Sequence, residues 1–588
     1  MIRLSRLAVI LCAWMLAASV VSSARADRPA APRLLPERTL AYARIADTQL
    51  LVERFRETAL GRIGQDEEVK PLVSQLYASA QQLWSRIEAQ VGLPLDQLLR
   101  IPQGEICFAV VAPPEMRPGV IFLIDVKDQL TQARKLLDKG EELLVENGGR
   151  KEVEKVGEVE VAAYVGPDGN TLYELEREGT ILIASDKELL RFVLSAWDGQ
   201  AEKTLADSHK FNTIMSRCSG AVDDPPQLTL FADPVEIFRT VARGNFAATA
   251  LALLPVLGLD GVQGIGASVT FGSGEFDSVQ HVHLLLDNPR AGVLQLLAMS
   301  PGDSTPEPWV PAGIVSYSTF NWDLQQTYDK GGLLYNSLTS EGAFQEEVRR
   351  RVGDRLGVDF EKDLLPALGG RFTFAQWIEH PVRLNSMASL IGLSLKEPSQ
   401  FGPTLETIVK KLDENAEKKA FGGVSYWTMK PLFRRPTERP DGPALRQPDP
   451  CVAIVGDTLL ITDSSAALVE AIKTAAEPAL GLAGDLEFKL IASKIKRQVG
   501  GDAPGMLSFS RPEQNLRFWY DLAAADDTRQ QVNRRGENNP VFFELDKALS
   551  DNPLPPFAVL AKYLAPGGGM MVNDETGLHY TTFTLRRK

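Results

Sequence analysis

The chain has 588 residues, which is too long for one hydrophobic core and predicts two to four domains. Apolar residues make up 44% of the sequence and charged residues 24%, a composition typical of a globular protein and not of a disordered one. The formal net charge of −13 disfavours nucleic acid as a partner, because phosphates require a basic surface, and it also disfavours general adhesion to anionic lipid.

Residues 1–26 have the features of a secretory signal peptide. Arg3 and Arg6 form a basic start, and residues 7–21 form an apolar segment that is short for a membrane span. Ala24 and Ala26 are small residues at the positions that a signal peptidase recognises. We therefore expect an extracytoplasmic protein, periplasmic or secreted, and an uncleaved anchor is the alternative. No later segment offers about 20 uninterrupted apolar residues, so we expect no membrane span after cleavage.

The first half of the mature chain, residues 27–298, contains strand and helix patterns in alternation. Apolar residues at every second position or in short runs predict strands, and apolar residues spaced by three and four predict helices. In chain order we expect a strand at 34–46, helices at 48–63 and 69–91, strands at 106–112 and 119–126, a helix at 129–146, strands at 159–165, 171–176 and 180–184, a helix from 187, a strand at 228–231, a helix from 234, and strands at 266–271 and 279–286.

Residues 299–311 are rich in proline, glycine and serine and are expected to link two halves of the chain. The second half, residues 312–588, repeats the order of predicted elements. Short turns between neighbouring strands favour antiparallel pairing. We therefore expect an α+β fold in two divergent tandem copies of one domain, each a mostly antiparallel sheet with helices packed on one face.

The clearest repeated pattern is a strand, a polar turn and a helix at residues 180–196. Ser185 or Asp186 can cap this helix by accepting a hydrogen bond from a free backbone N–H group. The same pattern returns 278 positions later, at residues 458–475, where Asp463 or Ser464 can cap. A recurrence over this distance indicates an internal duplication.

Weaker matches extend the two copies in both directions. Residues 92–99 match residues 357–364 at an offset of 265, and Tyr42 matches Tyr317 at an offset of 275. The offset rises from 265 to 278 across the proline-rich segment 430–450, which we interpret as an insertion of 13 residues in the second copy. Coincidence between two ordinary α+β domains is the alternative explanation of these matches.

Three cysteines follow the signal segment: Cys107, Cys218 and Cys451. An odd and sparse set does not form a disulfide framework. Cys107 and Cys451 lie in apolar strand-like runs, where a thiol most simply acts as a small buried hydrophobic group. One disulfide can form in an oxidising compartment, but the sequence does not show which two cysteines would pair.

His281-Val-His283 places two imidazoles on the same face of a predicted strand, because side chains alternate along a strand. Two imidazoles in this arrangement are two potential metal ligands, but no third histidine or cysteine lies nearby in the sequence. We therefore favour a solvated strand face over a metal site. His209, His380 and His579 are interpreted as isolated, and the sequence contains no His-Glu-x-x-His motif.

Other motifs have simple structural explanations. The glycines of residues 261–266 and 567–569 precede strands, so we interpret them as tight turns that need a positive φ and not as phosphate-binding loops. Gly272-Ser273-Gly274 lacks the spacing of a nucleophile elbow. The acidic pairs Asp223-Asp224 and Asp526-Asp527 are expected to be solvated and not to act in general acid–base chemistry.

The segment 430–450 contains four arginines in an otherwise acidic chain: Arg434, Arg435, Arg439 and Arg446. A solvated insertion is the favoured interpretation, because proline and charge cannot bury apolar surface. A docking loop is the alternative.

Three stretches of the sequence resemble an uncharacterised family of secreted bacterial proteins known only as a domain of unknown function. They are Leu-Pro-Glu-Arg-Thr-Leu-Ala-Tyr at residues 35–42, Glu-Thr-Ala-Leu-Gly-Arg at residues 57–62 and Leu-Ile-Ala-Ser-Asp at residues 182–186. The resemblance would cover most of the mature chain. It implies no activity, cofactor or catalytic residue.

The sequence predicts a non-catalytic extracytoplasmic protein that binds a ligand or an envelope partner, or an envelope-associated structural protein. No catalytic residue, cofactor or metal is assigned, and the partner, an envelope ligand or protein, is not specified. The alternative is an extracytoplasmic hydrolase with an unfamiliar active site. A deep cleft that holds a serine, cysteine or carboxylate within hydrogen-bond reach of a histidine would favour the alternative.

Overall fold

The computed structural model describes residues 28–114, 116–219, 224–242, 244–431, 445–498, 503–525, 528–530, 533–534 and 539–587. The expected signal segment, residues 1–26, lies outside the described residues. No helix among the described residues is long and apolar enough to cross a membrane.

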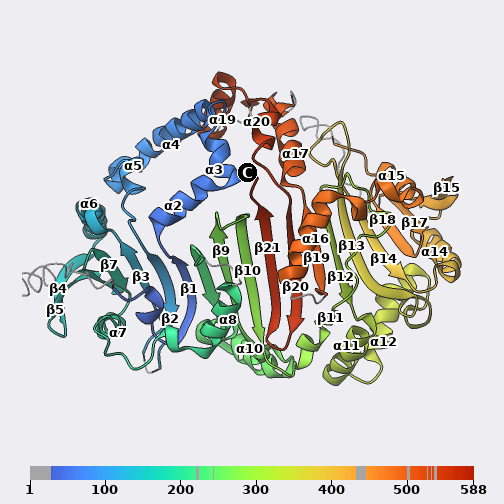
Figure 1. Ribbon diagram of the computed structural model, residues 1–588. Coiled ribbons are helices and arrows are strands. Elements are labelled where there is room, and N and C mark those ends of the chain that lie inside the picture. Colours follow the sequence, from blue (N-terminus) through green and yellow to red (C-terminus); the bar gives the residue numbers. More distant parts are fainter. Residues whose placement is uncertain are drawn as a thin grey trace, which may run out of the picture.

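The fold is α+β and is organised by one continuous antiparallel sheet, as Figure 1 shows. Across the first half, the neighbouring strands are β4 (Arg150–Val156), β5 (Val159–Val165), β6 (Thr171–Arg177), β7 (Thr180–Ala184), β3 (Gly119–Asp125), β2 (Ile106–Val111), β1 (Thr39–Ile45), β8 (Leu228–Ala232), β9 (Val262–Phe271) and β10 (Phe276–Leu286). The sheet continues through β21 (Gly577–Leu585), β20 (Gly567–Asp574), β19 (Met506–Ser510), β12 (Ser316–Trp322), β13 (Leu368–Ile378), β14 (Met387–Leu395), β18 (Thr458–Thr462), β17 (Cys451–Val455), β16 (Val424–Thr428) and β15 (Glu417–Phe421). A short strand, β11 (Met299–Ser300), pairs with the end of β12.

The strand order is the same in both halves when each is followed outward from the pairing of β10 with β21, which we call the seam. Strand β1 corresponds to β12, β2 to β13, β8 to β19, and β10 to β21. At the seam, His281 lies opposite Thr581, Val279 opposite Phe583, and His283 opposite His579. The two halves are therefore joined edge to edge into one sheet instead of forming two separate sheets.

A buried aromatic triad recurs in each half. Tyr42 and Phe231 both meet Phe211 edge to face, each at a centroid distance of 5.5 Å. In the second half, Tyr317 and Phe509 meet Phe488 edge to face at 6.0 and 5.7 Å. In both triads the tyrosine and one phenylalanine come from paired strands, and the second phenylalanine comes from the helix above them. Edge-to-face contacts of this kind stabilise a core beyond the apolar area that they bury.

The helices of the first half are α2 (Thr48–Glu57), α3 (Ala59–Gln65), α4 (Lys70–Val91), α5 (Leu95–Leu98), α6 (Leu130–Glu146), α7 (Lys187–Trp197), α8 (His209–Ser219), α9 (Pro234–Val241) and α10 (Gly244–Val256), with short helical turns η1 (Ala31–Arg33), η2 (Lys127–Gln129), η3 (Leu205–Asp207), η4 (Leu259–Gly261) and η5 (Gly292–Leu296). The helices of the second half are α11 (Leu324–Leu338), α12 (Ala343–Val348), α13 (Asp354–Leu356), α14 (Pro398–Leu412), α15 (Ser465–Ala476), α16 (Leu486–Gln498), α17 (Pro512–Ala524), α19 (Pro540–Asp551) and α20 (Phe557–Ala561), with the turns η6 (Arg349–Gly353), η7 (Phe360–Leu364), η8 (Pro478–Leu480) and η9 (Leu482–Gly484).

The repeated strand–turn–helix pattern is present at both predicted places. The Asp186 carboxylate accepts a hydrogen bond from the Glu188 N–H group at the start of α7, and the Ser464 hydroxyl accepts one from the Ala467 N–H group at the start of α15. The helix expected at residues 48–63 is instead divided into α2 and α3 at Thr58, whose extended backbone begins α3. The Thr58 hydroxyl accepts a hydrogen bond from the Gly61 N–H group, so the threonine serves as a new N-cap.

Helices cover the two faces of the sheet unequally. Helices α7, α8, α15 and α16 bury their apolar sides against one face, which we call the covered face. On the opposite face, α6 covers the outer strands of the first half and α14 covers those of the second. The expectation that helices lie on one face is thus wrong for the outer strands, because the side chains of β3, β7, β14 and β18 are apolar on both sides.

Glycines let the helices approach the covered face closely. A Cβ atom on Gly266 of β9 would lie 2.2 Å from Cγ2 of Ile214 in α8, and one on Gly568 of β20 would lie 2.2 Å from Cγ2 of Ile491 in α16. The interpretation of residues 261–266 and 567–569 as positive-φ turns is therefore wrong at these positions, which lie within strands. The absent side chain makes room for an isoleucine of the helix above.

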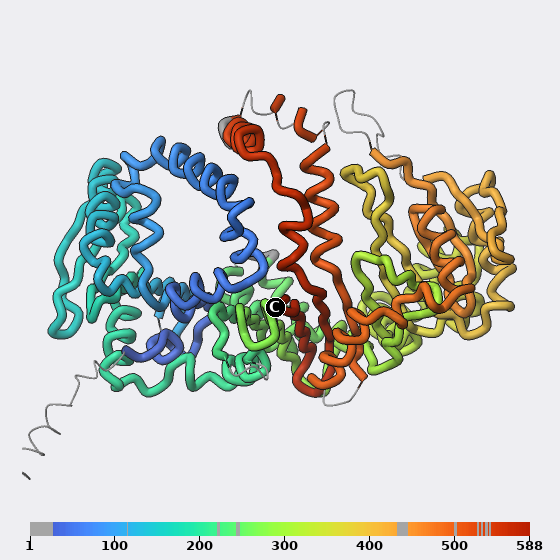
Figure 2. The backbone as a smooth tube through the Cα atoms, turned by 45° about the horizontal axis from the view of Figure 1, so that its top comes forward, coloured from blue at the N-terminus to red at the C-terminus, as the bar shows by residue number. Residues whose placement is uncertain are grey.

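Helices also connect the two halves at both ends of the central strands. At one end, α4 of the first half packs against α19 of the second, and the Ser79 hydroxyl donates a 2.9 Å hydrogen bond to the buried Glu544 carboxylate. At the other end, η5 of the first half packs against α11 of the second. Figure 2 shows the first of these connections where the blue and red helices approach each other at the top of the molecule.

Candidate functional site

The central part of the sheet presents one largely uncovered surface. We define the open face as the face opposite α8 and α16 of ten neighbouring strands: β2, β1, β8, β9, β10, β21, β20, β19, β12 and β13. Burial alternates along these strands, so that one face is packed and the other is partly exposed. Four apolar side chains of the open face remain substantially exposed: Phe108 (44%), Leu230 (53%), Ile265 (39%) and Phe374 (42%).

Phe108 and Phe374 occupy corresponding positions in the two halves. Each directly precedes a buried alanine, Ala109 in β2 and Ala375 in β13, that faces the tyrosine of the aromatic triad across the strand pair. Ala109 and Ala375 lie on the covered face with the triad tyrosines. Neighbouring side chains of a strand point to opposite faces of the sheet, so Phe108 and Phe374 lie on the open face. Exposed phenylalanine at both positions indicates a surface property that the two halves share.

Four aromatic side chains form a ladder on the second half of the open face. Phe320 stacks on Phe372 with centroids 5.2 Å apart and planes inclined by 8°, and on Phe374 at 6.1 Å and 14°. Trp322 lies beside Phe320 at 6.2 Å, and its indole N–H donates a 2.8 Å hydrogen bond to the Thr327 hydroxyl in α11. Because the rings stack on one another, they present mainly their C–H edges to solvent and few free ring faces.

Two structures bound the open face along the strand direction. At one end, Phe55 of α2 contacts Phe271 at a centroid distance of 6.1 Å, and Arg54 donates a hydrogen bond to the Gly272 carbonyl. At the other end, Asn573 of β20 donates hydrogen bonds to the carbonyls of Leu297 and Met299. The open face is therefore a bounded surface between α2 and the segment that contains η5 and β11.

Three histidines meet on the covered face at the seam. His281 and His283 of β10 lie beside His579 of β21, with ring centroids 5.4 and 5.6 Å from that of His579. The Thr581 hydroxyl lies 3.1 Å from Nδ1 of His281 and 3.1 Å from Nε2 of His579. Four ring nitrogens have no hydrogen-bond partner in the described part of the chain: Nε2 of His281, both nitrogens of His283 and Nδ1 of His579.

The histidine cluster corrects two sequence interpretations. The strand face with His281 and His283 is not solvated, because His281 is nearly fully buried and His283 fully buried. His579 is not isolated, because the pairing of β10 with β21 brings it across the seam. His281 and His579 are 298 positions apart in the sequence, so no local pattern indicates their contact. Only the register of the seam strands, which contact predictions from many related sequences can supply, would have revealed it.

Burial keeps the cluster uncharged near neutral pH. Burial, together with the nearby Arg217, lowers the pKa of His283 to about 4. Burial, together with His281, His283 and Arg217, lowers the pKa of His579 to about 3. Burial also lowers the pKa of His281. Among the described residues, no group of three or more histidine, cysteine or acidic side chains is arranged to hold a metal ion. The arrangement therefore acts as a buried, neutral contact between the two halves.

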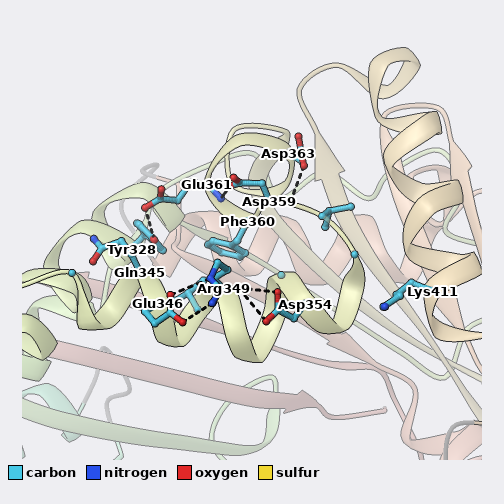
Figure 3. A pocket seen from close by; sticks show the side chains of 15 residues that line it. Tyr328, Gln345, Glu346, Arg349, Asp354, Asp359, Phe360, Glu361, Asp363 and Lys411 are labelled. Atoms are coloured by element: carbon cyan, nitrogen blue, oxygen red, sulfur yellow. Dashed lines mark hydrogen bonds and ion pairs between the residues drawn. The ribbon is translucent and has the colours of Figure 1, made fainter.

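A polar cavity of about 830 Å³ lies in the second half, between α11, α12, η6 and η7 (Figure 3). Several of the polar and charged side chains that line this cavity are bonded to one another. Arg349 bonds both Glu346 and Asp354, and the Tyr328 hydroxyl donates a 2.7 Å hydrogen bond to Glu361. These ion pairs lie on an exposed surface, where such pairs contribute little to stability.

The remaining sequence candidates are the serine of Gly272-Ser273-Gly274 and the two acidic pairs. Ser273 lies in the turn between β9 and β10, where its carbonyl accepts a hydrogen bond from Phe276. Asp224 forms an ion pair with Arg54 at 3.4 Å. Asp223, Asp526 and Asp527 lie outside the described residues.

The cysteines and the arginine-containing segment have simple environments. Cys107, Cys218 and Cys451 are buried free thiols, as expected for small hydrophobic groups, and burial raises the pKa of each to about 12. Arg446 is buried and ion-paired with Asp463 and Glu379, so this part of segment 430–450 is not the solvated insertion that the sequence favoured. Arg434, Arg435 and Arg439 lie outside the described residues.

No protein-family model, no curated protein and no solved structure matches the chain.

Proposed function

We propose that this protein is a non-catalytic, extracytoplasmic binding protein whose open face holds the apolar part of an amphipathic envelope lipid. The observation that carries the proposal is the set of four exposed apolar side chains on the open face, two of which, Phe108 and Phe374, occupy corresponding positions in the two halves. Contiguous exposed apolar surface is uncommon on soluble monomers and marks sites of interaction.

The chemistry of the open face favours acyl chains over other envelope ligands. The stacked rings of Phe320, Phe372 and Phe374 present apolar edges and few free faces, whereas bases are bound by stacking on ring faces. Acyl chains need only contiguous apolar surface, because their binding energy follows the area removed from water. The net charge of −13 further disfavours a nucleic acid.

We also propose that the chain arose by tandem duplication and is exported by its N-terminal segment. The duplication is supported by the shared strand order, the two aromatic triads and the two helix-facing glycines. Export is supported by the basic, apolar and small-residue parts of residues 1–26.

The hydrolase alternative requires a deep cleft that holds a serine, cysteine or carboxylate within hydrogen-bond reach of a histidine. The hydrogen bonds of the described histidine side chains join His281 and His579 to each other and to Thr581, and His209 to Thr213. No specific observation in the described part of the chain favours this alternative.

The proposal is tested by purifying the protein from its own host without detergent. Native mass spectrometry before and after organic extraction would identify bound molecules. We expect a lipid of one or a few acyl species at up to one equivalent per chain, retained through gel filtration. A ligand-free monomer that binds no short-chain lipid, or one that hydrolyses generic ester or peptide substrates, would overturn the proposal.

A further inference from the structure

A cavity of about 440 Å³ lies at the end of the open face, where η5, β11 and the start of α11 meet. Its wall includes Arg290, Met299, Asp323, Gln326 and Asn573. Gly568 of β20 faces α16, and Asn573 lies five positions after it in the same strand, so the Asn573 side chain points to the open face. The cavity and the open face are therefore adjacent.

Arg290 enters this cavity with one end of its guanidinium fixed. Nη2 donates to the Asn573 side-chain oxygen at 2.6 Å, to the Asp574 carbonyl at 3.0 Å and to the Gly577 carbonyl at 3.4 Å. Nη1 has a single long contact, 3.4 Å, to the Leu297 carbonyl. Three acceptors at one nitrogen hold the planar group in position, while Nη1 and Nε retain donor capacity.

No carboxylate balances the charge of Arg290 in the described part of the chain. Other partly buried arginines do have such partners: Arg371 pairs with Glu307 and Arg511 with Asp485. Burial lowers the pKa of Arg290 from its ordinary value, and no nearby carboxylate offsets this effect. A partly buried guanidinium held only by neutral groups is costly unless another anion completes its shell.

We infer that Arg290 binds a phosphate or carboxylate group, so that this cavity holds the anionic head of a ligand whose apolar part lies on the open face. The inference rests on the proposed function for the apolar part, but the anion site itself does not. Arginine suits the role because its planar donors match phosphate and carboxylate oxygens in a bidentate geometry. Charge-assisted hydrogen bonds of this kind are roughly twice as strong as neutral ones.

Asp323 adds a selective feature on the same cavity wall. Its carboxylate accepts a 2.8 Å hydrogen bond from the Gln326 N–H group and so caps α11. The Asp323 carboxylate repels a ligand head group that carries two negative charges more strongly than one that carries a single charge, so the site should favour singly charged anions. Asparagine is an equally good N-cap, so Asp323→Asn removes the charge while keeping the cap.

The test measures binding to the full mature chain by calorimetry with three probes: inorganic phosphate, dihexanoyl phosphatidic acid below its micelle concentration, and neutral dihexanoylglycerol. We expect Arg290→Gln to weaken both anionic probes by about tenfold or more and to leave the neutral probe unchanged. Arg290→Lys should lose part of the affinity, since a lysine keeps the charge but not the planar donors. Asp323→Asn should tighten phosphate binding, and 0.5 M salt should weaken it.

The outcomes separate the inference from the proposed function. Phosphate and phosphatidic acid bound with equal affinity, both lost in Arg290→Gln, would support the anion site and count against binding on the open face. Phosphatidic acid bound equally well by the parent chain and Arg290→Gln would overturn the anion site and leave the open-face proposal standing. Absence of measurable binding of both anionic probes to the parent chain would also overturn the anion site. Thermal denaturation of each variant shows whether the fold is retained.

Discussion

His281 and His579 lie almost parallel across the seam, with ring centroids 5.4 Å apart and planes inclined by 19°. His283 completes the cluster, and Arg217 and Cys218 of α8 lie above it. Arg217 is itself ion-paired with Asp574, at the end of β20. The contact between the two halves thus includes three buried, neutral imidazoles. If they were protonated, the imidazoles would repel one another and would repel Arg217.

This cluster should make the protein less stable in acid. The pKa of His283 falls from 6.5 in the unfolded chain to about 4 in the native state, so the unfolded chain binds the proton first. Stability from this group is therefore complete above pH 6.5 and decreases as the pH falls toward 4, by on the order of 3 kcal/mol. Urea denaturation at pH 7.5 and pH 4.5 measures the change.

Substitution of the cluster should flatten this dependence. His283→Leu is expected to leave stability at pH 7.5 nearly unchanged, because both ring nitrogens lack hydrogen-bond partners, and to reduce the loss at pH 4.5. The exposed His209 provides the control, since His209→Gln should retain the full acid sensitivity. An acid sensitivity of His283→Leu equal to that of the parent chain would count against the seam as its origin.

The close approach of α16 to the sheet predicts a cost for Gly568→Ala. The new Cβ would lie 2.2 Å from Cγ2 of the fully buried Ile491, so the helix must move or the isoleucine must change rotamer. We expect a loss of about 1–3 kcal/mol in the free energy of unfolding. Gly402→Ala in α14, where nothing lies within 4 Å of the added carbon, should be neutral or stabilising by about 0.5–1 kcal/mol. Equal effects of the two substitutions would disprove this explanation of Gly568.

The contact between α4 and α19 includes a buried hydrogen bond. Ser79→Ala removes the donor to the Glu544 carboxylate and leaves a buried oxygen without this partner. We expect a loss of about 1–3 kcal/mol and faster proteolysis of the α19 region. Ser85→Ala in the same helix is the matched control, because its hydroxyl makes only an exposed bond to the Gln82 carbonyl. A stability loss in Ser85→Ala as large as that in Ser79→Ala would show that helix propensity causes both.

The exposed phenylalanines should matter for binding while the fold is retained. The double substitution Phe108→Asp and Phe374→Asp should lower the free energy of unfolding by about 1–3 kcal/mol, because aspartate is unfavourable in a strand and Phe374 also loses its stacking on Phe320. The lipid that co-purifies with the parent chain should be lost. Leu486→Asp, at an 80% exposed leucine outside the open face, should retain it. Retention of lipid by the double variant would place the binding surface elsewhere.

Local features of this fold were predictable from the sequence. The capped helices after β7 and β18 follow from an apolar run, a polar cap and apolar residues at helical spacing, and the structure contains both. The antiparallel sheet followed from short turns between apolar runs. Tyr42 and Tyr317, matched by offset alone, do occupy corresponding places in the two triads.

Features that depend on long-range pairing were not predictable. The seam joins strands that are about 300 residues apart, and no local pattern specifies which edge strands meet. For the same reason His579 was interpreted as isolated. From the sequence we expect turns at Gly266 and Gly568, because the pattern of residues does not distinguish a glycine that permits a turn from a strand glycine that makes room for a helix packed on the sheet. Arg290 carried no motif, and only the arrangement of neutral acceptors around it distinguishes it.

The seam has a consequence for any fragment of this chain. Each half, produced alone, would expose an entire edge strand, β10 with 11 residues or β21 with 9, whose free N–H and C=O groups favour association. Because the pairing is symmetric about His281 and Thr581, two copies of one half could meet through the same edge and rebuild a sheet of similar width as a homodimer. In the full-length chain, each half pairs with the free edge strand of the other, so neither edge is available for pairing with a second molecule.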